Sequence, residues 1–247
     1  MTAHERHVAL KTLLETQGQV QVSVVAREWG VSEMTVRRDL GCLEDQGLLA
    51  RVHGGAVASG ALSWTSRAAR HRREKAAAAA KLVDLLPHGG CLYLDGSTTI
   101  VHLTAALARR RGLVVATNNI DTFQRLIHQP GLEVLLVGGL LNRGTDNFVG
   151  PLALRSVEAL HFDLACFSAF ALHPQGGCLE PALEDAAVKQ GVCERAQRIA
   201  VAVNHHKFHQ QAAGAWGGEP GRSILASDLD PADPRLDPFR PSFCQIL

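Results

Sequence analysis

Residues 30–46 read Gly-Val-Ser-Glu-Met-Thr-Val-Arg-Arg-Asp-Leu-Gly-Cys-Leu-Glu-Asp-Gln, and this stretch decides the fold of the first part of the chain. Ser32 can accept a hydrogen bond from an early helical N–H, and Glu33 places its charge at the positive end of a helix. Apolar residues with helical spacing follow at Val36, Leu40 and Leu43. We therefore expect a helix over about 33–46 with one buried face, begun by a tight turn at residues 30–32.

Two further helical patterns precede this one. In the first, an apolar stripe ends at Gly18 and consists of Val8, Leu10, Leu13 and Leu14. The second is short, spans about 22–29, and has its inward positions at Val24, Val25 and Trp29. This helix and the one over 33–46 are two short helices of which the second is polar and carries arginines, the arrangement that lays a helix in the major groove of DNA.

The polar positions of the third helix are the candidate DNA contacts. Arg37 and Arg38 point about 100° apart on a helix, so one can reach base edges while the other grips phosphate. Ser32 and Thr35 lie at the start of the same helix and complete this set. The alternative is a solvated face on which the arginines pair with Asp39 or Glu44, as is common on protein surfaces.

The residues after this helix predict a wing. Gly47 ends the helix, and residues 48–57 then predict two short strands around a turn that Gly54 and Gly55 make possible. Arg51 and His53 would lie near the DNA backbone. We thus predict a winged helix-turn-helix domain over residues 1–57.

Charge does not by itself indicate a nucleic-acid-binding protein. The net charge is +1, and residues 1–57 contain six Lys and Arg against seven Asp and Glu, so the DNA hypothesis rests on where the arginines lie. A basic cluster between 67 and 75 is opposed only by Glu74 and consists of Arg67, Arg70, His71, Arg72, Arg73 and Lys75. We treat residues 58–73 as a linker.

Composition is that of a globular protein, with 46% hydrophobic and 20% charged residues. No apolar run reaches the roughly 18 residues that span a bilayer, and the charged start does not resemble a signal peptide, so we expect a cytoplasmic protein without a membrane partner. The six cysteines form no Cys-x-x-Cys pair, and most lie in apolar stretches. We expect them to be reduced and buried, with no disulfide, zinc or other cofactor.

Helices and short apolar strands alternate over residues 74–247. Helices are expected at about 74–86, 98–110, 121–128, 151–160 and 181–197, and strands at 91–95, 113–117, 133–137, 164–170 and 199–203. Continuous apolar strands are typical of a mostly parallel sheet covered on both faces. We predict an open α/β domain that binds its ligand beyond the carboxyl ends of its strands.

One such strand end carries Asp95-Gly96-Ser97-Thr98-Thr99, where a strand passes directly into a helix. Glycine permits close approach, backbone N–H groups and a helix dipole favour an anion, and three hydroxyls add donors, so this segment is a candidate phosphate cradle. The alternative is a plain helix-capping turn. Further candidates at strand ends are Asn118, Gly138, Gly139 and Lys207, for which a turn or a surface position is the alternative.

The chain closely resembles the deoxyribose-operon repressor (DeoR) family of bacterial regulators. The N-terminal resemblance rests on Val31-Ser-Glu-Met-Thr-Val-Arg-Arg-Asp-Leu40, Leu43-Glu44, Gly47-Leu48-Leu49 and Arg51-Val-His-Gly-Gly-Ala56. It continues through Arg67, Glu74-Lys75, Leu94-Asp-Gly-Ser-Thr-Thr99, Thr117-Asn118, Gly138-Gly139 and Val149-Gly150. The resemblance implies an oligomeric repressor of a carbohydrate operon, released by a sugar phosphate, whose sensor domain is similar in fold to ribose-5-phosphate isomerase.

The chain also departs from the pattern of this family. Asn204 stands where members usually have Asp ahead of the equivalent lysine, an expected Asp-Gly pair is replaced by Phe170-Ala171, and His173 stands where an acid is common. Lost carboxylates alter which hydroxyls can be bound, so the effector is altered or absent. The proline-rich tail at 231–241 is expected to be irregular.

The leading hypothesis is therefore a DNA-binding repressor, and not an enzyme. An isomerase with an attached DNA-binding module is the rival, because the crevice offers the carboxylates of Asp95, Asp163, Glu184 and Asp185 as candidate bases. A metal-dependent sensor is a third class, weakened because His205-His206 has no cysteine or carboxylate at ligand spacing in the chain. Paired half-sites in DNA imply a homo-oligomer, either a dimer or a tetramer.

Overall fold

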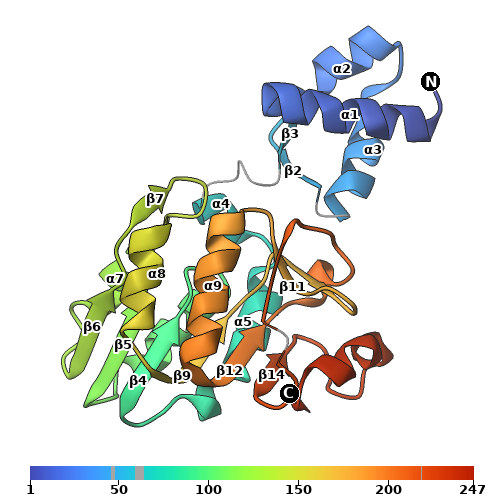
Figure 1. The fold of residues 1–247 in the computed structure, drawn as a ribbon. Helices are drawn as coiled ribbons and strands as arrows, with labels where there is room; N and C mark the ends of the chain where they lie inside the picture. Colours follow the sequence, from blue (N-terminus) through green and yellow to red (C-terminus); the bar gives the residue numbers. More distant parts are fainter. Residues whose placement is uncertain (46–47, 59–63, 218) are drawn as a thin grey trace. The chain divides into compact units, whose positions relative to one another are not determined.

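A computed structural model describes residues 1–45, 48–58, 64–217 and 219–247. The chain forms two compact units, Met1–Ser66 and Arg67–Leu247, each with its own hydrophobic core (Figure 1). The division falls inside the stretch 58–73 that the sequence analysis treats as a linker. A short helix, α4 (Trp64–Ala69), lies in that stretch.

The first unit is a three-helix domain with a small antiparallel sheet. Its helices are α1 (Ala3–Gln17), α2 (Val22–Trp29) and α3 (Glu33–Asp45). Its strands are β1 (Gln19–Gln21), β2 (Leu49–Val52) and β3 (Gly55–Ala58), in the order β1-β3-β2. The winged helix-turn-helix prediction is confirmed, with both ends of α2 and the start of α3 as predicted. The predicted end of α3 at Gly47 lies outside the described residues, and β1, with one buried residue between two glutamines, was not predicted.

Helical geometry explains which apolar residues of this unit are buried. Leu10 and Leu14, four residues apart, face the core of α1, whereas Val8 is 51% exposed. The prediction that Val8 faces inward was wrong, because a residue two positions before Leu10 lies about 200° around the helix. On α3 the three predicted core residues, Val36, Leu40 and Leu43, are fully buried.

The second unit is built on a seven-stranded parallel sheet in the order β15-β14-β12-β9-β4-β5-β6. The bounds are β4 (Gly90–Leu94), β5 (Leu113–Thr117), β6 (Leu132–Leu136), β9 (Phe162–Phe167), β12 (Ala196–Ala202), β14 (Ser223–Ala226) and β15 (Gln245–Ile246). The predicted open α/β fold is confirmed. The two outermost strands on one side, β14 and β15, were not predicted.

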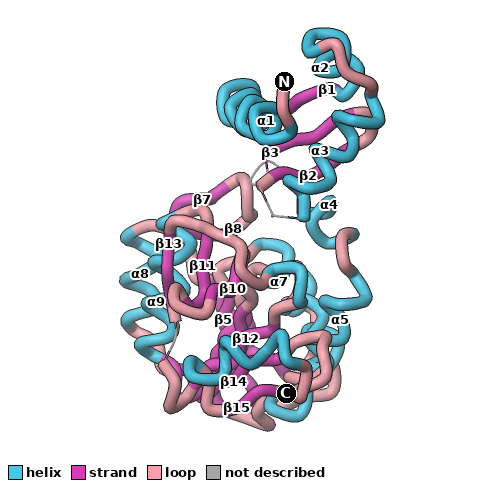
Figure 2. The backbone as a smooth tube through the Cα atoms, turned by 90° about the vertical axis from the view of Figure 1, so that its right-hand side faces the viewer, coloured by secondary structure: helices cyan, strands magenta, loops and turns pink. Residues whose placement is uncertain are grey.

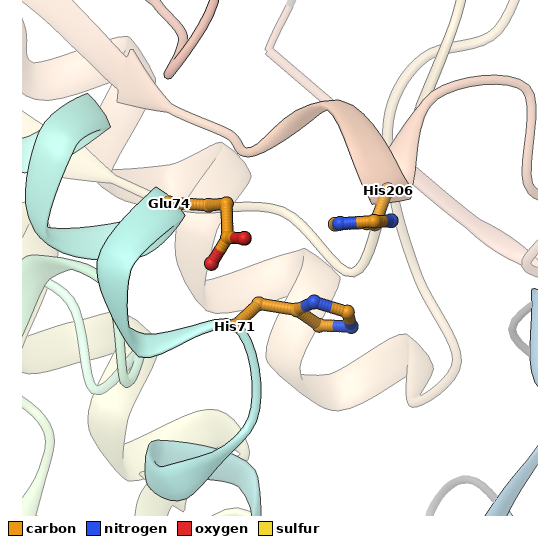
Figure 3. A group of neighbouring side chains, drawn as sticks. All are labelled: His71, Glu74 and His206. Carbon is orange, nitrogen blue, oxygen red and sulfur yellow. The ribbon is translucent and has the colours of Figure 1, made fainter.

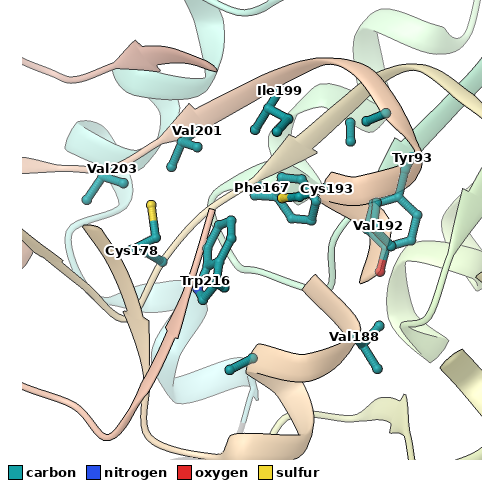
Figure 4. Packing of buried hydrophobic residues seen from close by; sticks show 14 of the residues in the cluster. Tyr93, Phe167, Cys178, Val188, Val192, Cys193, Ile199, Val201, Val203 and Trp216 are labelled. Atoms are coloured by element: carbon teal, nitrogen blue, oxygen red, sulfur yellow. The ribbon is translucent and has the colours of Figure 1, made fainter. Parts of the chain in front are cut away.

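Helices cover both faces of this sheet, as Figure 2 shows. One face carries α8 (Pro151–Glu158) and α9 (Leu183–Arg195), and the other carries α5 (Arg72–Ala80) and α7 (Ile120–Leu126). Side chains alternate accordingly. Tyr93, Phe167 and Val201 pack in the core under α9 (Figure 4), while their neighbours Leu92, Leu94 and Ala200 pack in the opposite core.

Some predicted helices are shorter than expected, and several small elements were not predicted. The helix predicted at 98–110 consists of a 3₁₀ turn, η3 (Ile100–Leu103), and a single α turn, α6 (Thr104–Leu107). Further unpredicted elements are a hairpin, β7 (Leu140–Asn142) with β8 (Asn147–Val149), and a sheet of β10 (Ala171–His173), β11 (Gly177–Glu180) and β13 (Gly214–Trp216). The tail expected to be irregular contains 3₁₀ turns, η5 (Pro234–Ser242).

The cysteines divide by position. Cys166, Cys178 and Cys193 are buried, Cys91 is half-buried, and Cys42 and Cys244 are exposed. Burial was therefore predicted correctly for three of the six and in part for Cys91, but not for Cys42, which lies on the solvent side of α3, or for Cys244 near the C-terminus. Among the described residues, none of the helices combines the length and apolar character that a membrane crossing needs.

Candidate functional site

The start of helix α3 is fixed by its own polar side chains. The Thr35 N–H donates to Ser32 Oγ at 3.1 Å, which confirms Ser32 as the N-cap, and the two hydroxyl oxygens lie 2.9 Å apart. Ser32 is exposed and Thr35 is half-buried. Both hydroxyls therefore order the end of the helix at which contact with a DNA groove is expected.

Arg37 and Arg38 are both exposed on α3. Arg37 donates to Glu33 Oε2 at 3.0 Å, one turn earlier, and both side chains of this pair are about half exposed. Arg38 has no ion pair or hydrogen bond among the described residues. An exposed pair of this kind contributes about 0.2–1 kcal/mol, so a phosphate can displace Glu33 at little cost.

The two acidic residues that could instead pair with Arg37 and Arg38, Asp39 and Glu44, make contacts with other residues. Asp39 is buried and accepts hydrogen bonds from Arg6 of α1, at 2.6 Å to Nε and 3.2 Å to a terminal nitrogen. Burial raises the pKa of Asp39, but the Arg6 guanidinium and His7 outweigh that effect and hold the pKa below its usual value. The Arg6–Asp39 pair clamps α3 to α1. Sequence reasoning missed it because the partners lie 33 residues apart.

The wing is attached to α3 by a second clamp. Arg51 donates from its backbone N–H and from Nε to the carboxylate of Glu44, at 2.9 and 2.7 Å. His53 is exposed in the turn, and Gly54 has a φ of 75°, which favours glycine. A Cβ on Gly55 would lie 2.1 Å from the carbonyl oxygen of Val20, so β3 can pair with β1 only if this residue is glycine.

In the second unit, the strand order reverses between β4 and β9. From β4 the chain continues outward to β5 and β6, and from β9 it continues outward on the other side to β12, β14 and β15. Ligands of open α/β sheets bind at such a point, beyond the carboxyl ends of the strands. Asp95 and Ser168 are the residues that follow β4 and β9 there.

Asp95 joins these two strand ends. Its Oδ2 accepts from the Ser168 N–H and its Oδ1 from the Ser97 N–H, both at 2.9 Å, and only 1% of the residue is exposed. Next to it, a Cβ on Gly96 would lie 1.9 Å from Asn147 Oδ1, so only glycine fits. The segment is thus held tightly, and the Asp95 carboxylate has a structural role in joining the two strand ends.

The hydroxyls after Gly96 are placed differently from one another. Ser97 Oγ accepts from the Ile100 N–H at 3.1 Å and caps the 3₁₀ turn. Thr98 and Thr99 are buried, and Thr99 Oγ1 has no hydrogen-bond partner among the described residues. The expected helix dipole is nearly absent, because a 3₁₀ turn and a single α turn replace the long helix on which that expectation depended.

Three further predicted effector residues have structural contacts. Asn118 accepts from the Tyr93 hydroxyl and donates to the Phe148 carbonyl oxygen, both at 2.9 Å. A Cβ on Gly139 would lie 2.5 Å from the Val149 carbonyl oxygen, so this glycine lets the β7–β8 hairpin pack closely. A Cβ on Gly138 would meet open space, and this residue is half-buried.

Lysines converge on the same strand ends. Lys207 donates from Nζ to the Ala169 carbonyl oxygen at 2.5 Å and to Ser168 Oγ at 3.2 Å. Lys189, on α9, is buried and donates to the Ser168 carbonyl oxygen at 2.7 Å, while its Nζ lies 2.5 Å from Glu180 Oε1 and 3.2 Å from Asp95 Oδ2. Burial lowers the pKa of Lys189, but the two carboxylates outweigh it and raise that pKa, so Lys189 stays charged.

A third lysine, Lys75, lies near enough to Lys207 for the two charges to repel each other. Lys75, on α5, is 4% exposed and donates to the Arg67 carbonyl oxygen. Burial, followed by the charges of Lys207, Arg70 and Arg67, lowers its pKa to about 7. Burial lowers the pKa of Lys207 to about 8, against the attraction of Glu180. A bound anion would stabilise positive groups that lie close together and are poorly solvated.

Only Lys207 of this lysine set was singled out from its place in the sequence as an effector-binding candidate. Lys75 lies in a run of alanines and Lys189 in an amphipathic helix, where a lysine is normally on the surface. The signal that was present is the Glu74-Lys75 match to the family pattern. Asn204, after β12, is 1% exposed, and neither end of its amide has a partner among the described residues.

The candidate catalytic carboxylates are engaged or lie elsewhere. Asp185 accepts from Asn142 and Asn147, both at 2.7 Å. Asp163 accepts from the Cys91 N–H at 2.8 Å and lies at the amino end of β9, so its placement in the crevice was wrong. Glu184 is exposed at the start of α9.

Comparison with known proteins gives consistent matches over most of the chain. The model of the DeoR-like helix-turn-helix domain matches residues 6–60, and that of the DeoR C terminal sensor domain matches residues 70–216. The chain is 30% identical to the HTH-type transcriptional repressor CsqR of Escherichia coli (strain K12), over 94% of this chain and 90% of that protein. It is 28% identical to the glycerol-3-phosphate regulon repressor of the same organism, over 94% and 93%.

Among solved structures, ribose 5 phosphate isomerase A from Neisseria gonorrhoeae is similar with a TM-score of 0.40 and 13% identity. The match covers 56% of this chain and 53% of that one.

Proposed function

This chain belongs to the DeoR family of transcriptional regulators, and we propose that it is a repressor of a carbohydrate operon that a small phosphorylated sugar releases from DNA. Its relatives are named transcriptional repressors, one of them of a glycerol-3-phosphate regulon. We further propose that it acts in the cytoplasm as a homo-oligomer, because paired recognition helices read paired half-sites.

The observation that carries the DNA-binding half of the proposal is the outward placement of Arg37 and Arg38 on a helix fixed at three points. Ser32 caps the helix, Arg6 holds Asp39, and Arg51 of the wing holds Glu44. A rigid helix loses little conformational entropy when it enters a groove. In the proposed complex the two arginines contact bases and phosphate, and Arg51 and His53 of the wing contact the backbone.

The effector half of the proposal depends on the cations at the carboxyl ends of β9 and β12. Lys75, Lys207 and Arg67 lie close enough for their charges to affect one another. Thr99 Oγ1 and the Asn204 amide add buried polar groups without protein partners among the described residues. A phosphate would meet the lysines, and the sugar hydroxyls would meet such amide and hydroxyl groups.

The isomerase alternative is not favoured by any of these contacts. A carboxylate base has to be available to the substrate carbon that loses its proton. Asp95 and Asp185 instead accept hydrogen bonds from the framework, and Asp163 is at the other end of the sheet. We therefore propose a binding role for this crevice without turnover.

Thermal-shift screening of the purified full chain against a panel of sugar phosphates tests the effector proposal. We expect at least one compound to raise the melting temperature of the wild type, because a ligand that binds only the folded state stabilises it. The Lys207→Met variant should lose that shift, while the exposed Arg155→Met variant should keep it. A panel without any stabilising compound, or a shift that survives in Lys207→Met, would argue against an anion site at these strand ends.

A further inference from the structure

A cluster of three metal-ligating side chains lies outside the sites described above (Figure 3). His71 and Glu74 belong to the start of α5, and His206 belongs to the 3₁₀ turn η4 (His205–Lys207) that follows β12. One ligand atom from each residue lies within 4.8 Å of the other two. We propose that His71, Glu74 and His206 bind a divalent transition-metal ion, with Zn²⁺ as the best match.

The two ligands on α5 are placed by the helix. They are three positions apart, so their side chains lie on the same face. His71 is the N-cap residue and has a φ of 49°, a left-handed conformation that an L residue keeps only when its surroundings fix it. Its carbonyl oxygen accepts from the Lys75 N–H at 2.9 Å, which ties this conformation to the first turn of the helix.

The third ligand is next to a residue that is held firmly. His205 donates from its backbone N–H to Asp228 Oδ1 at 2.8 Å, and its Nδ1 lies 2.6 Å from Asp228 Oδ2. The neighbouring His206 ring stacks on the His71 ring, with centroids 4.0 Å apart and planes 27° apart. The fold thus brings the His206 ring to a carboxylate 132 positions earlier in the chain, a partner that could not be found in the sequence near His205-His206.

The charge of the cluster comes from its one carboxylate. An imidazole binds a metal through an unprotonated nitrogen, so His71 and His206 would coordinate as neutral rings. The half-buried carboxylate of Glu74 then supplies the negative charge, although Lys75 and Arg70 nearby reduce its effect.

The donor set points to a particular class of ion. Two imidazole nitrogens and one carboxylate oxygen are a ligand set of zinc sites that keep a fourth position for water, whereas Mg²⁺ and Ca²⁺ prefer oxygen ligands alone. Tetrahedral bonds of about 2.0–2.1 Å place ligand atoms roughly 3.4 Å apart. From separations of up to 4.8 Å, the ligand atoms would close by about 1.4 Å at most, a change that side-chain rotations of the three residues can supply.

Metal binding to the full chain can be measured directly. The chain is stripped with a chelator and titrated with Zn²⁺ alone by calorimetry, in a Cys42→Ser/Cys244→Ser background because these two thiols are exposed and cysteine is itself a zinc ligand. We expect one ion per chain, with affinity reduced roughly tenfold or more in His206→Ala and in Glu74→Gln. The matched control is His128→Ala, which removes an exposed histidine outside the cluster and should bind as the parent does.

The absorption spectrum of bound Co²⁺ is a second measurement, which reports the ligands of the metal and does not depend on the stability of the protein. Co²⁺ in place of Zn²⁺ should give the visible absorption of a four-coordinate ion with nitrogen and oxygen ligands, and His206→Ala should lose it. Glu74→Gln preserves the size of the side chain, and His206 is exposed, so both variants should fold, which circular dichroism checks. Absence of binding by the stripped parent, or binding that survives unchanged in both variants, would overturn the proposal.

Discussion

The proposed DNA-binding and effector-binding sites, one in each unit, place their cations in opposite ways. In the first, Arg37 and Arg38 project from a helix into solvent, and the contacts that hold the helix are made by other residues. In the second, Lys75 and Lys189 are buried and Lys207 is partly buried, and their ammonium groups are held by carbonyl and carboxylate oxygens. The difference corresponds to the size of the proposed ligand: a duplex meets side chains in solvent, whereas a small anion has to be enclosed.

The largest effect should come from a buried cation. Lys189→Met would leave the carboxylates of Glu180 and Asp95 close together without their shared counter-charge. We expect the second unit to lose about 3–5 kcal/mol of unfolding free energy, as when one partner of a buried ion pair is removed. Urea unfolding monitored by tryptophan fluorescence in a Trp29→Phe/Trp64→Phe background measures this, because the remaining Trp216 ring has its centre 4.9 Å from Lys189 Nζ.

The control for Lys189 is an exposed arginine of the same unit. Arg155→Met should change stability by less than about 0.5 kcal/mol. Equal effects in the two variants would remove the distinction between buried and exposed cations on which the comparison depends.

The next largest effect concerns the exposed arginines. Arg38→Ala should weaken binding to operator DNA by about 1–3 kcal/mol if the side chain contacts a base, or reduce the salt dependence by about one ion if it contacts phosphate. Stability should be unchanged, because Arg38 is exposed and has no partner among the described residues. Fluorescence anisotropy at several salt concentrations distinguishes the two kinds of contact.

Arg109→Ala, an exposed arginine of the second unit, is the matched control for Arg38. Its DNA affinity should equal that of the wild type. An Arg38→Ala protein that binds as tightly as this control at every salt concentration would show that α3 does not use Arg38.

A smaller effect is expected at Asn204. Its amide is buried without a partner among the described residues, and an unsatisfied buried polar group costs about 1–3 kcal/mol. Asn204→Leu should therefore raise the melting temperature by roughly 2–4 °C per kcal/mol gained, and should weaken any stabilisation by a sugar phosphate. Differential scanning calorimetry with and without the ligand measures both, and a lower melting temperature in the absence of ligand would contradict this interpretation of Asn204.

The smallest effect is on the pH dependence of the first unit. The pKa of Asp39 is lowered in the folded state from an ordinary value of 3.8, so its stabilisation is fully present above that value and is lost as the pH falls through the folded pKa. Peptides from residues 1–45 should therefore become more accessible to pepsin below about pH 4. Asp39→Asn should be less stable at neutral pH, and should show a weaker dependence on pH in the acid range.

Local patterns predicted much of this structure. The helices predicted at about 22–29 and 33–46 were found from the spacing of their apolar residues, which repeat within one or two turns, and from the Ser32 cap next to the second of them. The strands β4, β5, β9 and β12 were identified because each is a continuous apolar run between turns. These signals depend only on neighbours in the chain.

What could not be predicted depends on contacts between distant residues. The Arg6–Asp39 clamp, the Lys189–Glu180 pair and the position of Glu74 beside His206 all require the folded chain. The short strands β10, β11 and β13 carry too few residues to show a periodic pattern. Asp163 was misplaced because β9 begins at Phe162, which puts this carboxylate at the amino end of the strand.

Binding of the full chain to a duplex from upstream of its own gene tests most directly whether the outward arginines of α3 serve a regulator. We expect tighter binding to that duplex than to a scrambled one, weakened by salt, by Arg37→Ala/Arg38→Ala, and by at least one sugar phosphate. Equal affinity for both duplexes at every salt concentration, unchanged in the double variant, would contradict a DNA-reading function.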